Sequence, residues 1–293
     1  RLRETAALAL EQSGAPDKAI DLALLGGAWT LARRLILRRA EDLLAQGRRA
    51  TLIDWCARFP AAEQDAWLCY WRGVAHVPDD LEAEAWLAKA WSLFESAGDL
   101  EGQHLSVARA VLVKTDSWRT HTGLSLWTHR ALALLGQPTP ALRPNDELLV
   151  LMGLLRALDF ADDYRDAAPK ASALARRLLA RLDAPKQEDQ VNLRLLASAT
   201  ILEHAGSMGQ AELFEQAVDM VARDLRHTAI SPWVLGLWLV AFGSVSGRYF
   251  PYGRRGFPYA DAEAALRAAI AIGETESLPA VEFGALYHLQ YQM

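Results

Sequence analysis

Residues 81–99 read LEAEAWLAKAWSLFESAGD, and this stretch decides the fold. In a helix, the small residues Ala83 and Ala90 lie on the same face as the large residues Trp91 and Phe94. A second helix can approach closely at the alanines while the aromatic rings fill the space beside them. Because one helix cannot bury such a face alone, the stretch predicts packing between neighbouring helices.

Similar amphipathic segments follow one another along the rest of the chain. We expect helices over about residues 1–11, 15–25, 28–45, 50–59, 62–77, 81–97, 100–113, 119–135, 145–164, 168–182, 187–204, 208–225, 231–245, 258–272 and 278–291. We expect Gly98 and Gly273 to end helices, and Gly206-Ser207 to end one helix and begin the next. The alternation of apolar and polar residues that predicts half-buried strands is missing, so the sequence predicts an all-α fold.

The expected long helices recur with a regular spacing. They begin near residues 145, 187, 231 and 278, about 42 to 47 residues apart, which is typical of helical-pair repeats. Two partner helices also match at a constant offset, in the positions Ala83, Leu87, Ala90 and Leu93 against Ala262, Leu266, Ala269 and Ile272. We therefore expect a right-handed superhelix of stacked antiparallel helix pairs, a tetratricopeptide-like α-solenoid with a concave surface. The alternative is chance similarity among helices rich in alanine and leucine.

The composition narrows the class of protein. With 52% apolar and 23% charged residues, the chain has ample material for a globular core. A net charge of -5 argues against binding to nucleic acid. The two cysteines, Cys56 and Cys69, are expected to be buried free thiols, which fits a cytoplasmic location. The longest uncharged run, residues 231–247, is too short to span a membrane, so we expect a buried helix there.

Motifs that would indicate catalysis or a cofactor are weak or missing. Asp162, Asp163 and Asp166 match the D-D-x-x-D pattern with which all-helical isoprenoid enzymes hold magnesium, but neither a second metal motif nor a basic diphosphate clamp accompanies them. The seven histidines, His204 among them, form no zinc motif, so we expect them in solvent or at helix ends. No G-x-x-x-x-G-K-[ST] loop occurs. We expect a protein that is not an enzyme, with no catalytic residues, no metal and no cofactor.

Residues 248–259, RYFPYGRRGFPY, form the most unusual segment. They join two expected helices of one pair by a longer connection than other pairs use, and long loops of this kind are often functional. Arginine together with aromatic residues suits an anionic or planar ligand or a protein interface. The candidate binding residues here are Arg248, Tyr249, Tyr252, Arg254, Arg255, Phe257 and Tyr259. The alternative is a loop whose aromatic rings fill the core while its arginines face water.

A second set of candidate binding residues is aromatic. Trp67, Tyr70 and Trp71 lie within about one turn of a single expected helix, in a chain that contains ten tryptophans. Aromatic residues at helical spacing are commonly part of a core. Alternatively, they line the concave face and stack on a ligand such as a sugar ring.

Six arginines cluster near the start of the chain, at Arg33, Arg34, Arg38, Arg39, Arg48 and Arg49. One interpretation is a solvated face, partly neutralised by Glu41 and Asp42. The other is a docking surface for a neighbouring module of the same protein.

Residues 15–60, APDKAIDLALLGGAWTLARRLILRRAEDLLAQGRRATLIDWCARFP, carry a recognisable skeleton. Its positions are Ala19, Ile20, Gly27, Trp29, Leu43, Leu44, Ala45, Gln46, Gly47, Thr51, Leu52, Trp55, Phe59 and Pro60. This skeleton resembles the helical segment of MalT-like, LuxR-type ATP-dependent large bacterial transcriptional regulators, the type that includes maltose-regulon activators. Residues 70–103 are similar to the first tetratricopeptide-like repeats of that family, and after about residue 115 the similarity is generic.

The resemblance implies a domain organisation and a role. Residues 1–60 would be an N-terminal helical segment linked to a nucleotide-binding switch module, and residues 61–293 one continuous repeat array. The switch module and a DNA-binding module are expected elsewhere in the same polypeptide, of which this chain, opening on Arg1, would be a piece. The array would sense a small-molecule inducer or a regulatory protein. The alternatives are a stand-alone tetratricopeptide-like scaffold for protein–protein interaction and, from the acidic motif, an isoprenoid-type enzyme.

Overall fold

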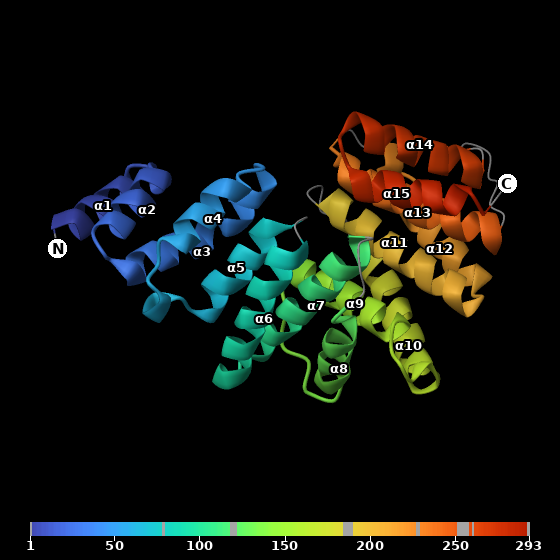
Figure 1. Ribbon diagram of the computed structural model, residues 1–293, viewed down its shortest axis with the longest axis horizontal. Helices are drawn as coiled ribbons and strands as arrows, with labels where there is room; N and C mark the ends of the chain where they lie inside the picture. Colours follow the sequence, from blue (N-terminus) through green and yellow to red (C-terminus); the bar gives the residue numbers. More distant parts are fainter. Residues whose placement is uncertain are drawn as a thin grey trace. The chain divides into compact units, whose positions relative to one another are not determined.

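The computed structural model describes residues 2–77, 80–117, 122–183, 190–226, 229–250, 258–259 and 261–291, and within these ranges the secondary structure is helical, with no β-strand. The predicted all-α class is therefore confirmed. The helices belong to two compact units, unit 1 over residues 1–106 and unit 2 over residues 107–293 (Figure 1). The domain boundary expected after residue 60 stays a prediction.

Unit 1 is built from helices that pack on their neighbours in chain order. Its elements are α1 (Leu2–Gln12), α2 (Pro16–Leu25), α3 (Trp29–Ala45), α4 (Arg49–Ala57), the 3₁₀ turn η1 (Ala61–Glu63), α5 (Ala66–His76), α6 (Asp80–Ala97) and the first turns of α7 (Leu100–Asp116). Each of α1 to α5 contacts the next helix along the chain, and α3 also contacts α5. Ile20, Ile36, Leu43 and Leu52 are fully buried between them.

Unit 2 contains the rest of α7 and the helices that follow it. They are α8 (Leu124–Leu135), α9 (Pro144–Asp159), α10 (Tyr164–Leu182), α11 (Val191–Met208), α12 (Ala211–Val221), the turn η3 (Asp224–Arg226), α13 (Pro232–Arg248), α14 (Ala262–Thr275) and α15 (Pro279–Leu289).

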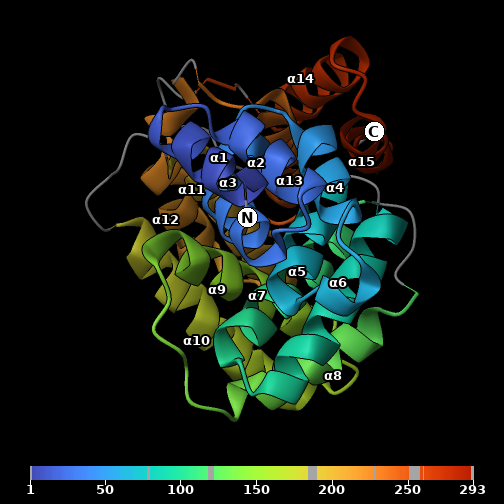
Figure 2. The same ribbon diagram turned by 90° about the vertical axis from the view of Figure 1, so that its left-hand side faces the viewer.

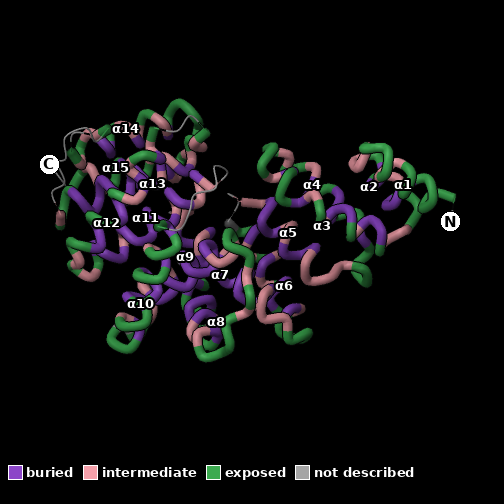
Figure 3. The backbone as a smooth tube through the Cα atoms, turned by 180° about the vertical axis from the view of Figure 1, so that it is seen from behind, coloured by how far each residue is buried: buried purple, intermediate pink, exposed green. Residues whose placement is uncertain are grey.

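Alternate helices of unit 2 form a buried row. Helix α9 contacts α11, α11 contacts α13, and α13 contacts α15, while α10, α12 and α14 pack on the row as partners. Helices α9, α11 and α13 are buried along most of their length, whereas α10 ends in exposed turns (Figure 3). Figure 2 shows α14 and α15 at one edge of unit 2. The core of unit 2 therefore runs along this row.

Glycines allow helices of the row to come close together. A Cβ atom at Gly153 of α9 would lie 2.3 Å from the Cα atom of Ala108 on α7, and one at Gly236 of α13 would lie 2.5 Å from Val281 on α15. Such distances are too short for any side chain. Glycine in mid-helix costs conformational entropy, and here it permits backbone contact between helices.

The expected helix ends are partly right. Gly98 has φ +68° and follows α6, which confirms the predicted stop. The break predicted at Gly206-Ser207 is wrong, because α11 continues to Met208 and ends at Gly209, whose φ is +65°. Ser207 lies inside the helix and donates a hydrogen bond to the Glu203 carbonyl oxygen at 3.0 Å.

Helix α14 also differs from the prediction at both ends. It begins at Ala262, where the Asp261 side chain accepts a hydrogen bond from the Ala264 N–H at 2.8 Å. Gly273 does not end it, because α14 runs to Thr275. A Cβ at Gly273 would lie within 3 Å of the Glu282 backbone of α15, so this glycine serves close packing.

The uncharged run at residues 231–247 forms α13, which begins with Pro232 after Ser231 and is largely buried, as predicted. Within the described ranges, no helix combines the length and the hydrophobicity needed to cross a membrane. Cys56 and Cys69 are both buried free thiols, as expected, and burial raises the pKa of Cys56 to about 12.

Candidate functional site

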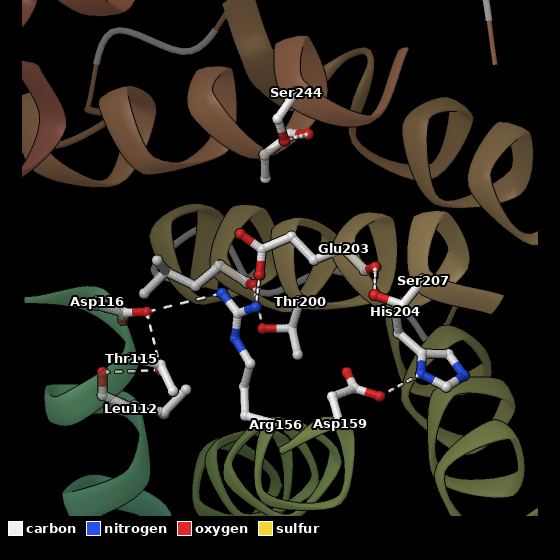
Figure 4. A network of polar contacts seen from close by, with 12 residues as sticks. Leu112, Thr115, Asp116, Arg156, Asp159, Thr200, Glu203, His204, Ser207 and Ser244 are labelled. Carbon is white, nitrogen blue, oxygen red and sulfur yellow. Dashed lines mark hydrogen bonds and ion pairs between the residues drawn. The ribbon is translucent and has the colours of Figure 1, made fainter. Parts of the chain in front are cut away.

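The most concentrated chemistry in unit 2 surrounds Arg156, in the last turns of α9. Its guanidinium lies between carboxylates of two other helices (Figure 4). One is Asp116 of α7, with Nη2 and Oδ1 3.8 Å apart, and the other is Glu203 of α11, which pairs with Nη1. Thr115 also donates a hydrogen bond to Asp116 Oδ1 at 3.4 Å. Arg156 thereby links three helices of the unit.

Burial governs the electrostatics of this group. It lowers the pKa of Arg156, while the negative charges of Asp116 and Asp159 oppose that shift. Burial likewise raises the pKa of Asp116, against the opposing effects of Arg156 and Thr115. Each charge therefore depends on the other for its ionised form, because a buried charge without a partner is strongly disfavoured.

Directly after Glu203 in α11, His204 is fully buried. Its Nδ1 lies 2.7 Å from Asp159 Oδ1 of α9, and its Nε2 lies 3.4 Å from Ser172 Oγ of α10. The Gln210 side chain at the start of α12 donates to the same Ser172 oxygen at 3.2 Å. These contacts join four consecutive helices. The expectation that His204 lies in solvent or at a helix end is wrong, since the imidazole satisfies buried polar groups of its neighbours.

The carboxylate–imidazole–hydroxyl order has the connectivity of a Ser–His–Asp triad. Nucleophilic catalysis also requires a reacting atom within reach of the serine oxygen. Ser172 is buried, its oxygen already accepts a hydrogen bond from Gln210, and His204 has no exposed surface. In this arrangement the contacts fix the positions of the helices relative to one another.

A second buried arginine makes similar contacts near the start of α11. Arg194 Nε donates to Asp224 Oδ2 at 2.9 Å, and its guanidinium also donates to the carbonyl oxygens of Leu182 at 2.5 Å and Met220 at 3.3 Å. The arginine therefore satisfies backbone groups at the ends of α10 and α12. We call these two clusters together the polar network. The first consists of Asp116, Arg156, Asp159, Ser172, Glu203 and His204, and the second of Arg194 and Asp224.

The aromatic candidates of α5 form a packed cluster in unit 1. The Trp67 ring lies edge-on to Phe94 of α6, with centroids 4.9 Å apart, and 5.7 Å from Tyr70. Tyr70 is buried and contacts Trp71 at 5.2 Å, while Trp67 and Trp71 are half-buried. These contacts help to bury the face between α5 and α6, and a ligand-binding role for the three residues stays a prediction.

The loop candidates belong to unit 2. Arg248 ends α13 and lies over the Tyr291 ring, 5.0 Å from its centroid. Tyr249 is exposed, and Tyr259 is half-buried, which raises its pKa. Tyr252, Arg254, Arg255 and Phe257 lie outside the described residues. The two candidate sets thus belong to different units, and binding by the loop also stays a prediction.

The arginine cluster of unit 1 is largely paired with acids on other elements. Arg34 and Arg38 contact Glu11 at 2.8 and 3.1 Å. Arg39 and Arg48 contact Asp17 at 3.4 and 2.7 Å, Arg33 pairs with Asp65, and Arg39 also lies 3.6 Å from Asp42. These partners neutralise much of the cluster, which supports the interpretation as a solvated, ion-paired face.

The acidic motif at residues 162–166 begins α10. Asp163 precedes the helix and accepts a hydrogen bond from the Asp166 N–H at 3.5 Å. Carboxylates are favourable at a helix N-terminus. In the part of the chain that the structure describes, no group of three or more His, Cys, Asp or Glu side chains could hold a metal ion.

Sequence reasoning missed the polar network, although one signal was present. Asp159 and His204 are 45 residues apart, within the predicted repeat spacing. Residues separated by one repeat fall on adjacent helices of a row, so a carboxylate and an imidazole at that spacing are candidates for contact. Comparisons of the chain with protein-family models, with curated proteins and with solved structures found no match.

Proposed function

We propose that this chain is the effector- or partner-sensing helical-repeat region of a bacterial signal-responsive transcriptional regulator. In this proposal it is a non-catalytic binding module, and its helix pairs form a tetratricopeptide-like superhelix. The observation that carries the proposal is the row α9, α11, α13 and α15, in which each helix packs on the next while its partner covers one side. This is the packing that a stack of repeats requires.

Several positions of the quoted skeleton have structural roles in unit 1. In the skeleton of residues 15–60, Gly27 and Gly47 have φ values of +67° and +73°, which favour glycine at these turns. Trp55 donates from Nε1 to Asp21 Oδ1 at 3.0 Å, and Phe59 is buried. These contacts describe how residues 15–60 pack within unit 1, and their relationship to the regulator family is part of the proposal.

The polar network supports a role in signal response. It ties α7, α9, α10, α11 and α12 together through charged and polar contacts, which are sensitive to small displacements of the helices. A ligand shifts such a unit only by binding one arrangement better than another. A binding module of this kind has two measurable properties. It binds a ligand saturably, and it changes conformation when the ligand binds. It catalyses no reaction.

A thermal-shift screen tests the proposal. The chain is heated with a panel of sugars, sugar phosphates, nucleotides, organic acids and amino acids, and each hit is titrated by calorimetry. We expect at least one saturable ligand, because binding to the native state at about 100 times Kd adds about 2.7 kcal/mol of stability. For a chain of this size that is about 5 °C or more in Tm.

Matched variants locate the binding site and exclude catalysis. Tyr249→Ser lies in the predicted loop site, and Leu126→Ser is a control at an equally exposed position of α8. We expect only Tyr249→Ser to weaken binding, by at least about fivefold. Covalent labelling of the chain by a fluorophosphonate probe, lost in Ser172→Ala, would overturn the non-catalytic assignment. A panel without hits, together with tight binding of one peptide partner, would favour the scaffold instead.

The encoding gene provides an independent test. We expect the same polypeptide to carry a nucleotide-binding module with a phosphate-binding loop and a DNA-binding module. A gene that lacks the nucleotide-binding module would overturn the regulator assignment. The chain would then be a binding module outside this class of regulator.

A further inference from the structure

Two positive charges converge on one tryptophan of unit 1. Arg72 of α5 lies over the Trp86 ring of α6, with its Cζ atom 3.8 Å from the ring centroid, and Lys89 Nζ lies 5.0 Å from the same centroid. Burial raises the pKa of Cys69 on α5, and the positive charges of Lys89 and Arg72 both oppose that shift. The two charges therefore act on the same part of the contact between α5 and α6.

Among the residues that the structure describes, neither Arg72 nor Lys89 forms an ion pair with a carboxylate. Other basic residues of unit 1 differ in this respect, such as Arg34 and Arg58, which reach carboxylate oxygens at 2.8 Å. An aromatic face attracts a cation through its quadrupole but does not neutralise its charge. The two side chains therefore present positive charge that is available to an anion.

Neutral groups hold the lysine in place. Lys89 Nζ donates a hydrogen bond to Gln64 Oε1 at 2.7 Å, and Gln64 Nε2 donates to the Phe59 carbonyl oxygen at 3.3 Å. An ammonium group carries three N–H donors, so the bond to Gln64 leaves donors for a ligand. Because Lys89 is exposed and Arg72 is half-buried, both are accessible from solvent.

Two enclosed nitrogen atoms on the same face of α5 have no hydrogen-bond partner in the described part of the chain. They are Arg72 Nε and, one turn further along the helix, His76 Nε2. Buried polar atoms without a partner are rare in folded proteins, and each needs an explanation such as a bound water or ion. A guanidinium N–H can only donate, so the partner that Arg72 lacks is an acceptor. This requirement favours a ligand rich in acceptor oxygens.

We propose that Arg72, Lys89 and Trp86 form a binding site for the phosphoryl group of a small phosphate ester. A phosphate monoester carries close to two negative charges at neutral pH, which matches the two cations. The guanidinium fork and the ammonium group donate to its oxygens, and Trp86 keeps the two cations together. The inference goes beyond the proposed function, because this site belongs to unit 1 and the loop of Tyr249 to unit 2, and it holds for any class of binding module.

Calorimetric titration of the 293-residue chain tests the inference. The probes are glycerol phosphate, inorganic phosphate, malate and glycerol. We expect saturable binding of the two phosphate compounds and none of glycerol. Their affinity should fall at least about threefold when sodium chloride is raised from about 50 mM to about 300 mM, because salt screens exposed charges. Selective binding of malate would overturn the phosphoryl assignment, and the lack of saturable binding of either phosphate compound up to about 20 mM would overturn the site.

Substitutions locate the bound phosphate. Lys89→Gln should weaken binding of glycerol phosphate at least about fivefold, and Arg72→Gln, which removes the fork, at least about tenfold. Because Arg72→Gln also loses the contact with Trp86, circular dichroism first checks that this variant folds. If it does not fold, Lys89→Gln, at an exposed position, decides the test. Unchanged affinity in Lys89→Gln would overturn the site.

Two controls separate this site from general attraction and from the loop. Lys170→Gln with Arg176→Gln removes two exposed charges of α10 in unit 2 and should change the affinity less than about twofold. Equal weakening by this control and by Lys89→Gln would overturn the inference, because binding would then depend on net charge alone. Tyr249→Ser should leave phosphate binding unchanged. Weakening by Tyr249→Ser and not by Lys89→Gln would reject the site in unit 1 and support the loop site instead.

Discussion

At the scale of single residues, Arg156 is the most consequential side chain of unit 2. Its guanidinium compensates Asp116 of α7 and Glu203 of α11, and their side chains are mostly buried. Removal of one partner from a buried ion pair leaves an uncompensated charge, whereas exposed pairs contribute little. Disruption of the polar network should therefore lower the stability of unit 2 mainly through the buried charges that lose their partners.

We predict that Arg156→Met lowers the free energy of unfolding by about 3 kcal/mol. The matched control is Arg267→Met, whose pair with Glu263 on α14 is exposed and which should cost less than about 0.5 kcal/mol. Urea unfolding followed by circular dichroism measures both. Adding Asp116→Asn and Glu203→Gln to Arg156→Met should recover more than half of the loss. Equal losses for the two arginine variants would contradict this account.

His288 of α15 makes stability depend on pH. Burial lowers the pKa of its imidazole to about 4, and the positive charge of Arg248 acts in the same direction. The neighbouring rings of Tyr287 and Tyr291 stay neutral in acid. Between pH 4 and 6.5 the His288 imidazole thus binds a proton in the unfolded chain but not in the folded chain. Stability therefore rises with pH across this window and is constant above it.

We predict that the wild-type chain loses about 1.5 kcal/mol from this group as the pH falls from 6.5 to 4. The full shift corresponds to about 3 kcal/mol, and partial exposure of the ring reduces it. His288→Asn should remove this part of the pH dependence in urea titrations at pH 4, 5, 6 and 7. The control His129→Asn, at an exposed position of α8, should retain it. An unchanged pH profile in His288→Asn would refute the prediction.

At the scale of helices, glycines decide how closely the row packs. We predict that Gly153→Ala destabilises the protein by about 2 kcal/mol, because the new Cβ would lie 2.3 Å from the Ala108 Cα atom and force α7 and α9 apart. Gly136→Ala is the control, since its Cβ meets only the Ala133 carbonyl oxygen at 3.5 Å and φ is -85°. That change should alter stability by less than about 1 kcal/mol. Thermal unfolding that ranks the two variants in reverse would reject this packing.

The same glycines explain what the sequence could predict about helices. Amphipathic spacing predicted which segments are helical, and Gly98 correctly predicted an end. The expectation that Gly206 and Gly273 end helices is wrong, because they lie inside α11 and α14. A glycine that ends a helix and a glycine that admits a neighbouring helix look alike locally. The second kind is explained only by its contact, and that contact is made by a residue far away in the sequence.

The candidate site was less predictable for a related reason. Aromatic and arginine-rich stretches are visible as compositional signals, whereas His204 and Asp159 become partners only when α9 and α11 are placed side by side in the correct register. The spacing of repeats predicts adjacency of two helices but not their register to within one turn. Polar contacts across a helix row are therefore visible only after the row has been built.

At the scale of the whole molecule, the chain comprises two compact units, residues 1–106 and 107–293. Within each unit, helices contact mainly their neighbours along the chain and the helix two further on. In the repeat array that we propose, stability would be approximately a sum of local terms and nearest-neighbour terms. A local defect should therefore be felt most strongly near its own position.

We predict that Arg156→Met increases amide hydrogen exchange mainly in α9 to α12, by at least about tenfold, and leaves α1 to α4 unchanged. The expected reason is that the polar network stabilises the helices it joins, and opening of those helices does not require unfolding of unit 1. Mass spectrometry of peptides from both units measures the effect, with Arg267→Met as the silent control. A uniform increase over both units would mean that the molecule unfolds as one cooperative body, which would contradict the prediction.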